Sequence, residues 1–156
     1  MSSDIERIVT KLMETEVWSE FLRLMFDEDS MRILITLYSV AKPLNDLQLS
    51  ELAGVSQSAL YRGLESLKKL GFAYEVFTLP PSYNLSENGK ILAEKLPKLL
   101  DDAIKGIEEC YTPKNETKPY FPTKSLEAIY EWYKTLQSRL REFKDNLNKK
   151  LKEKGL

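Results

Sequence analysis

Histidine is absent from the 156-residue sequence, and cysteine occurs once, at Cys110. The chain therefore lacks the commonest acid–base side chain, the Ser-His and Cys-His catalytic pairs and the usual zinc ligands. A single cysteine forms neither an internal disulfide nor a Cys-rich metal site, which favours a reducing cytoplasmic location. There is also no phosphate-binding loop and no Gly-x-Ser-x-Gly motif. We expect no metal, no cofactor and no enzymatic activity.

Long apolar runs are missing as well. No stretch of 18 apolar residues occurs, and the first residues carry acids without an unbroken apolar core. This predicts neither a transmembrane helix nor a signal peptide. Hydrophobic residues make up 42% and charged residues 30%, a profile typical of a globular protein with a single core. We therefore expect a cytoplasmic protein with no membrane partner.

The charge is nearly balanced but unevenly distributed. The net charge of −1 is not the overall signature of a nucleic-acid-binding protein. Residues 1–29 contain three basic and eight acidic side chains, whereas residues 120–156 contain nine basic and five acidic ones. A solvated helix at each end explains this polarity as well as a functional electrostatic field does.

Periodicity indicates a mostly helical chain. It predicts helices over residues 4–26, 31–42, 87–110 and from 124 onward, and strands over residues 72–77 and 83–86. Ser30 is the expected N-cap of the second of these helices, and Ser86 that of the third. Pro97 should kink or restart the helix in which it lies. The proline-rich residues 111–123 show no periodicity and are expected to form a linker or an extended arm.

The stretch "LSELAGVSQSALYRGLESLKKLGF", residues 49–72, contains two short helical patterns. Ser50 is a plausible N-cap of the first helix, and Gly54 can adopt the left-handed conformation that ends it. Ser56 should cap a second helix that runs to about Leu70 and closes at Gly71. Its apolar positions form one stripe, and the polar side chains fall outside it.

The last helix carries a heptad pattern. Its apolar residues are spaced alternately by three and four positions: Leu126, Ile129, Tyr133, Leu136, Leu140, Phe143 and Leu147. This pattern is typical of a coiled coil, and it predicts a homodimer because so long an exposed seam would associate. Packing of this helix on its own domain is the alternative.

The central unit resembles the winged helix-turn-helix of the MarR, ArsR and PadR groups of prokaryotic transcription regulators. The stretch 49–72 is similar to their helix-turn-helix, and "DEDSMRILITLY" resembles the helix before it. The segment "YNLSENGKIL" resembles their return strand and next helix, which often read Tyr-x-Leu-Thr-x-x-Gly. The resemblance covers residues 28–92, and the lysine-rich tail and long last helix are similar to archaeal regulators of this kind.

Together with the heptad pattern, this resemblance implies a mainly α fold with a small two- or three-stranded β wing and a long C-terminal dimerisation helix. With the periodicity of the flanking segments, it divides the chain into an N-terminal helical segment (1–29), a winged helix-turn-helix domain (30–110), the linker (111–123) and the dimerisation helix (124–156). The implied function is sequence-specific binding of double-stranded DNA by a homodimeric regulator, with repression favoured. The helix at 56–70 would enter the major groove. The implied DNA-binding residues are Ser56, Gln57, Ser58, Tyr61, Arg62, Lys68 and Lys69.

Several alternatives stay open. The predicted wing tip at residues 78–82 has no cation, so wing contacts with DNA are in question, and the lysines near the C-terminus could supply phosphate contacts instead. A low-specificity architectural DNA binder and a winged helix used for protein–protein contact are the rival functions. A small-molecule effector is left open as a partner, with its pocket lined by Trp18, Phe21, Tyr130, Trp132 and Tyr133.

Overall fold

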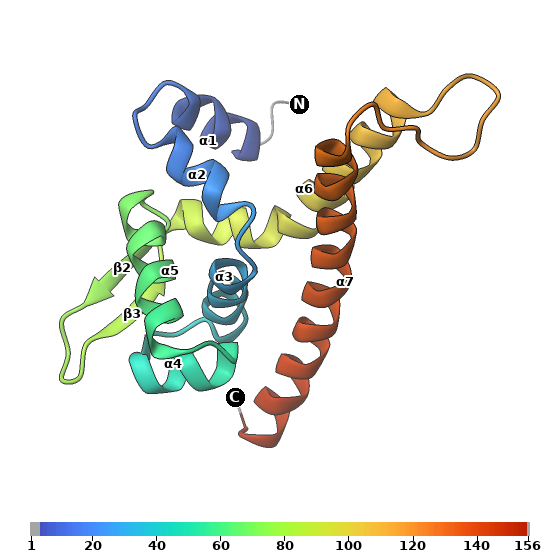
Figure 1. The fold of residues 1–156 in the computed structure, drawn as a ribbon. Helices are drawn as coiled ribbons and strands as arrows, with labels where there is room; N and C mark the ends of the chain where they lie inside the picture. Colours follow the sequence, from blue (N-terminus) through green and yellow to red (C-terminus); the bar gives the residue numbers. More distant parts are fainter. Residues whose placement is uncertain (1–3, 156) are drawn as a thin grey trace.

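The computed structural model of the chain describes residues 4–155 and is mainly helical (Figure 1). Its elements are α1 (Asp4–Met13), α2 (Trp18–Leu24), α3 (Glu28–Val40), β1 (Leu44–Asn45), α4 (Asp46–Ala53), α5 (Gln57–Lys69), β2 (Ala73–Val76), β3 (Ser82–Leu85), α6 (Glu87–Tyr111) and α7 (Lys124–Glu153). The three strands form one antiparallel sheet in the order β1-β3-β2. A mainly α chain with a small sheet and a long last helix is therefore confirmed.

The predicted single helix over residues 4–26 is wrong, because the chain turns between α1 and α2. At the break the Thr15 hydroxyl donates to the Leu12 carbonyl at 2.8 Å, and the Thr15 amide donates to the same oxygen at 3.0 Å. Such local hydrogen bonds replace the next helical turn. Both helices still bury apolar side chains, among them Ile8 and Phe21.

Two predicted helix starts are also wrong. Asp27, not Ser30, caps α3: its carboxylate accepts from the Ser30 amide at 3.2 Å, and Ser30 lies buried inside the helix. Asn45, not Ser50, caps α4, where it forms a capping box with Gln48. Aspartate and asparagine favour the N-cap position as strongly as serine does, so residue type alone does not distinguish the two candidates at either helix start.

The predicted caps around α5 and α6 are confirmed. Gly54 ends α4 in the left-handed region, with φ 65°. The Ser56 side chain accepts from the Ala59 amide at 3.2 Å, and Ser86 accepts from the Gly89 amide at 3.1 Å. The course of the chain from α4 to α6 is thus fixed largely by local hydrogen bonds.

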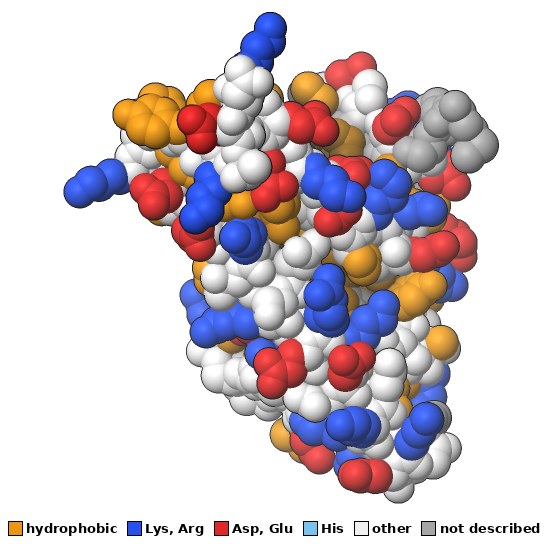
Figure 2. All heavy atoms as spheres, turned by 90° about the vertical axis from the view of Figure 1, so that its right-hand side faces the viewer, with side chains coloured by type: hydrophobic (Ala, Val, Ile, Leu, Met, Phe, Trp, Pro, Cys, Tyr) orange, Lys and Arg blue, Asp and Glu red, His pale blue; other side chains and the backbone are white. Residues whose placement is uncertain are grey.

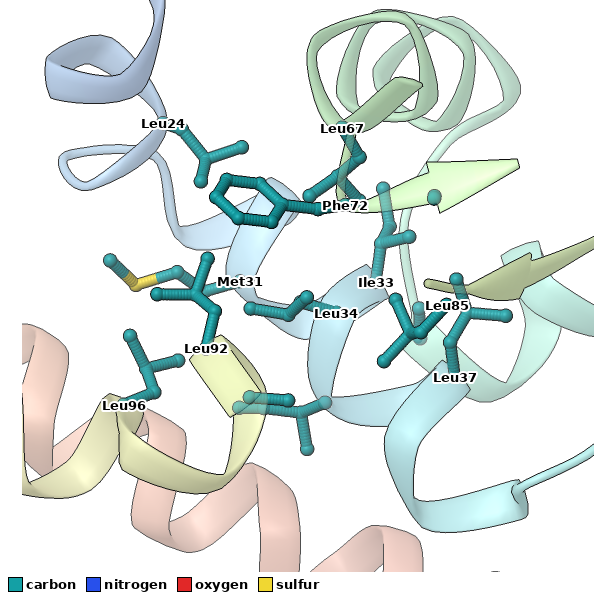
Figure 3. Close-up of a cluster of buried hydrophobic side chains, with 14 of the residues drawn as sticks. Leu24, Met31, Ile33, Leu34, Leu37, Leu67, Phe72, Leu85, Leu92 and Leu96 are labelled. Atoms are coloured by element: carbon teal, nitrogen blue, oxygen red, sulfur yellow. The ribbon is translucent and has the colours of Figure 1, made fainter. Parts of the chain in front are cut away.

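The core is built around α3, which contacts α4, α5, α6, α7 and β3. Figure 3 shows apolar side chains of α2, α5, β3, α6 and the loop before β2 packed against those of α3, among them Leu24, Leu67 and Leu92. Phe72, which precedes β2, is 1% exposed and lies within this cluster. The α5 helix is therefore held from behind by a continuous apolar core.

Helix α6 runs without interruption through Pro97, so a restart at this residue is excluded. Residues 112–123 follow as turns and bends without a helix or strand. Phe121 packs this segment onto the protein, with its ring centroid 5.7 Å from that of Tyr111 and 5.1 Å from that of Tyr130.

The heptad face of α7 packs within the chain, which corrects the predicted intermolecular seam. Helix α7 lies against α3 and α6, and its buried residues include Leu136, Leu140, Phe143 and Leu147. Of the seven seam residues only Ile129 is exposed, at 37%, while Leu126 and Tyr133 are half-buried. A heptad shows that a helix has one apolar face, but not which chain covers that face. Homodimerisation itself stays a prediction.

Across residues 4–155, none of the helices combines the length and the apolar character that a membrane span requires.

Candidate nucleic-acid interface

The site that the sequence predicts lies on the outer face of α5. Leu60, Leu64 and Leu67 on the inner face are at most 2% exposed. The opposite face is accessible along its length, since Tyr61 is 49% exposed and Arg62 is exposed as well. Figure 1 shows α5 next to the β2–β3 hairpin and above α4, while most of α7 runs along the opposite side of the molecule.

Gly63 explains how α5 comes so close to α3. It is buried, and a Cβ added there would lie 2.6 Å from Ile33 Cδ1 and 3.4 Å from Ser30 Oγ. The missing side chain therefore permits close helix packing, and it does not face the exposed surface that would meet DNA.

The N-terminus of α5 is open to solvent. Ser56, Gln57 and Ser58 are all exposed, and Ser56 Oγ lies 3.3 Å from Ser58 Oγ. The first-turn amides of a helix and its dipole favour a negatively charged group such as phosphate. This end of α5 therefore offers hydrogen-bond donors next to the Gln57 side chain.

Tyr61 is held by α4. Its hydroxyl donates to Asp46 Oδ2 at 2.7 Å, and this hydrogen bond, with the charge of Asp46, raises the tyrosine pKa. The other carboxylate oxygen of Asp46 is buried and has no hydrogen-bond partner among the described residues. Asp46 thus orients Tyr61 and places a negative charge beside the face, a contact that the sequence did not predict.

Arg62 lies between the exposed face and an acidic groove. The groove, of about 610 Å³, runs between α5 and the segment from α2 to α3. Its charged lining residues are Glu20, Arg23, Asp27, Asp29, Arg62 and Glu65. Burial and the nearby carboxylates of Asp27 and Glu28 raise the Asp29 pKa, an effect that Arg62 partly offsets.

Glu20 in this groove connects α2 to α5. Ser66 Oγ donates to Glu20 Oε1 at 2.6 Å, and this hydrogen bond lowers the Glu20 pKa. The acidic N-terminal segment therefore reaches α5 directly, and it limits how much positive potential the site can develop.

The two lysines at the end of α5 differ. Lys68 Nζ lies 3.2 Å from Glu65 Oε1 and 3.9 Å from Glu75 Oε1, so its charge is largely compensated within the chain. This counts against the phosphate contact predicted for Lys68. Lys69 is exposed and forms no ion pair in the part of the chain that is described.

The tip of the β2–β3 hairpin is apolar and fully exposed. Phe77 is 91% exposed and Leu79 is 100% exposed. The sequence showed that this tip lacks cations, but it did not show that these two side chains would stand in water. A run of apolar residues beside Pro80 and Pro81 was the available signal.

The aromatic effector pocket predicted from the sequence does not form, because its residues belong to separate clusters. Trp18 stacks on Phe21, with ring centroids 5.5 Å apart, and Tyr130 packs on Phe121. Tyr133 packs on Phe26 with centroids 5.1 Å apart, and the Trp132 indole donates to the Phe26 carbonyl at 3.2 Å.

A second groove, between α3, α6 and α7, is partly apolar. Its volume is about 600 Å³, and its apolar lining residues include Ile35, Leu96 and Leu140. Arg141 and Lys144 also line it. This groove lies on a different part of the fold from α5.

The lysine-rich end of α7 lies near the α4–α5 turn. Lys154 Nζ is 3.4 Å from Glu51 Oε1, and Lys149 and Lys150 line a shallow groove together with Gly54. Figure 2 shows that basic and acidic side chains are intermixed on the side where α7 lies. The tail is therefore close to the candidate interface without forming a purely basic surface.

Comparison of the chain with models of protein families, with curated proteins and with solved structures finds no match in any of the three.

Proposed function

We propose that the protein is a winged helix-turn-helix regulator that binds double-stranded DNA with α5 in the major groove. The observation that carries this proposal is the placement of α5. The helix follows α4 across the Gly54 turn, is anchored from behind by buried leucines, and turns Gln57, Tyr61 and Arg62 outward beside a β-hairpin. One helix fits into a major groove about 12 Å wide.

The exposed side chains suit the groove chemically. An arginine such as Arg62 can donate two hydrogen bonds to guanine, and a glutamine such as Gln57 can pair with adenine in the same way. Ser58 and the first amides of α5 would contact phosphate and set the register without reading sequence. Lys69 would add a phosphate contact at the other end of the helix.

The regulator would act as a homodimer, with two α5 helices in successive major grooves about 34 Å apart. Because four seam residues of α7 are buried in their own chain, the dimer contact must use other surface. Repression is favoured, since a small dimer needs only to occupy a promoter. No catalytic step and no cofactor are needed for this role.

Selection of bound duplexes from a random pool, with the full chain at two salt concentrations, tests the proposal. We expect enrichment of a motif with two related half-sites, and weaker binding at the higher salt concentration. Salt-dependent binding without enrichment would instead support a low-specificity architectural binder.

A winged helix used for protein–protein contact is the second candidate. The acidic groove beside Arg62 favours it, because four carboxylates next to the reading helix oppose a polyanion. In that case random duplex would show no binding at either salt concentration.

A further inference from the structure

The tip of the β2–β3 hairpin carries the two most exposed side chains among the large exposed hydrophobic residues of the structure. Phe77 and Leu79 are 91% and 100% exposed, and Pro80 and Pro81 beside them are also exposed. The five residues 77–81 include no charged side chain. Apolar groups so fully in water favour transfer to a less polar environment, which a partner must supply.

Internal hydrogen bonds shape this tip. The Thr78 hydroxyl donates to the Pro80 carbonyl at 2.8 Å and lies 3.2 Å from Ser82 Oγ, while the Thr78 amide donates to the Val76 carbonyl at 2.9 Å. The two apolar side chains are therefore presented on an organised turn.

The hairpin is also fixed relative to α5. Strand β2 contacts this helix, and the Lys68–Glu75 ion pair joins the two elements. Figure 1 shows the hairpin extending outward next to α5. A duplex bound along the outer face of α5 would therefore meet the tip beside the groove that the helix occupies.

We propose that Phe77 and Leu79 form an apolar wedge that enters the minor groove and inserts between base pairs, bending the DNA that α5 holds. This inference rests on the proposed function. Phenylalanine, leucine and proline are among the side chains that unstack base steps from the minor groove and kink the duplex. The tip holds no carboxylate that would repel phosphate and no cation that would only follow the backbone.

The shape of the tip favours DNA over a protein partner. A stable protein interface buries roughly 800 Å² on each side. Four apolar residues on a narrow projection offer much less than this, whereas a gap between two base pairs needs only one or two side chains. The wedge therefore fits a base step better than it fits a second folded surface.

Bending of an end-labelled duplex tests the wedge. The full chain is added to a duplex of about 30 base pairs taken from the selected pool, with a donor and an acceptor dye on its ends. We expect wild-type protein to bend it by about 20–90°, within the range of wedge-inserting proteins. The double variant Phe77→Ser, Leu79→Ser should bind but leave the duplex close to straight.

Tyr74→Ser is the matched control, because Tyr74 is 48% exposed on β2 but lies away from the tip. This variant should bend the duplex as the wild type does. Permanganate reactivity provides a second readout, since an unstacked thymine should be hyper-reactive with wild-type protein and protected with the double variant. Both substituted residues are exposed, so circular dichroism should show an unchanged fold.

The outcomes separate the two proposals. If wild-type protein binds the duplex and leaves it straight, or if the double variant bends it equally, the wedge is overturned and α5 binding stands. If no duplex is bound at all, the proposed function falls and the wedge falls with it. Self-association of wild-type protein without DNA that the double variant abolishes would assign the tip to a second copy of the chain, and would also overturn the wedge.

Discussion

Arg62 is the residue on which sequence reading by α5 would depend most. Its guanidinium is exposed, and its hydrogen bond within the described part of the chain is a long one, 3.4 Å from Nε to the Ser58 carbonyl of its own helix. Little therefore holds the side chain in place, and it can reorient toward a base. The neighbouring Tyr61 is tied to Asp46 and is less free to do so.

Replacing Arg62 by alanine should weaken binding to a selected duplex by about ten- to a hundredfold for each half-site, the cost of one bidentate base contact. Titration by fluorescence anisotropy measures this change. Arg141→Ala, an exposed arginine on α7, is the control and should bind like wild type. Unchanged affinity of Arg62→Ala would remove this residue from the reading face.

Glycine is required at position 89 because the backbone of a neighbouring segment packs against it, and not because of a contact with DNA. A Cβ at this position would lie 2.0 Å from the Phe72 carbonyl oxygen, which also accepts from the Ser86 amide. Backbone cannot move away cheaply, so Gly89→Ala should lower the free energy of unfolding by about 3 kcal/mol or more. Gly106→Ala in the same helix meets nothing within 4 Å and should raise it by about 0.5–1 kcal/mol. Urea denaturation measures the free energy of unfolding of both variants. Equal changes in the two would contradict the requirement for glycine at position 89.

At the scale of elements, α7 belongs to the core of its own chain. Leu136 is 0% exposed, whereas Ile129 on the same heptad pattern is 37% exposed. We expect Leu136→Ala to cost about 2–5 kcal/mol of stability, the usual range for a buried leucine, and Ile129→Ala to cost well under half of that. Urea denaturation measures both. If Leu136→Ala folds with wild-type stability and changes only the oligomeric state, α7 must pack between chains.

A hydrogen bond between two side chains also links α7 to α6. The Tyr130 hydroxyl donates to Glu108 Oε2 at 2.5 Å, and this bond raises the Tyr130 pKa to about 12. The ordinary tyrosine pKa is about 10, so the folded chain retains a proton that the unfolded chain loses between these values. The stability that this bond contributes is complete below about pH 10 and is lost as the pH rises toward 12.

Tyr130→Phe tests this contribution, since phenylalanine cannot ionise. Between about pH 10 and pH 12 the unfolding midpoint of the wild type should fall more steeply than that of the variant, although other groups titrate in both proteins. Thermal unfolding followed by circular dichroism is the measurement. Parallel curves over this range would show that the Tyr130–Glu108 bond contributes no pH dependence.

The elements that the sequence predicted well are those fixed by neighbours along the chain. Ser56, Gly54 and Ser86 act within a few residues, so their capping roles and the borders of α5 followed from local patterns. The seam of α7 and the effector pocket depended on which surfaces meet across the fold. Periodicity identifies an apolar face but not its partner, and it does not reveal that Glu65 and Glu75 compensate Lys68.

At the scale of the whole molecule, the charge distribution opposes strong nonspecific binding. The net charge is −1, and the acidic N-terminal segment reaches α5 through Glu20. Phosphate contacts dominate nonspecific affinity, so a chain with few unpaired cations near the helix proposed to enter the groove should bind random DNA weakly. Specific base contacts would then contribute a larger share of the affinity than is usual for basic regulators.

The salt dependence of binding can count these contacts. Arg62 and Lys69 are the two exposed cations of α5, and each phosphate neutralised contributes a slope of about −0.9 to log K against log salt. A dimer in which each Arg62 contacts a base and each Lys69 contacts a phosphate should therefore show a slope of about −2. Titrations of a selected duplex between 50 and 200 mM salt, conditions under which such slopes are resolved, provide the value. Lys69→Gln should make the slope shallower by about 2 per dimer, while Lys68→Gln should leave it unchanged because Lys68 is already paired. A wild-type slope near −8 would contradict this count and would bring the lysines at the end of α7 into the interface.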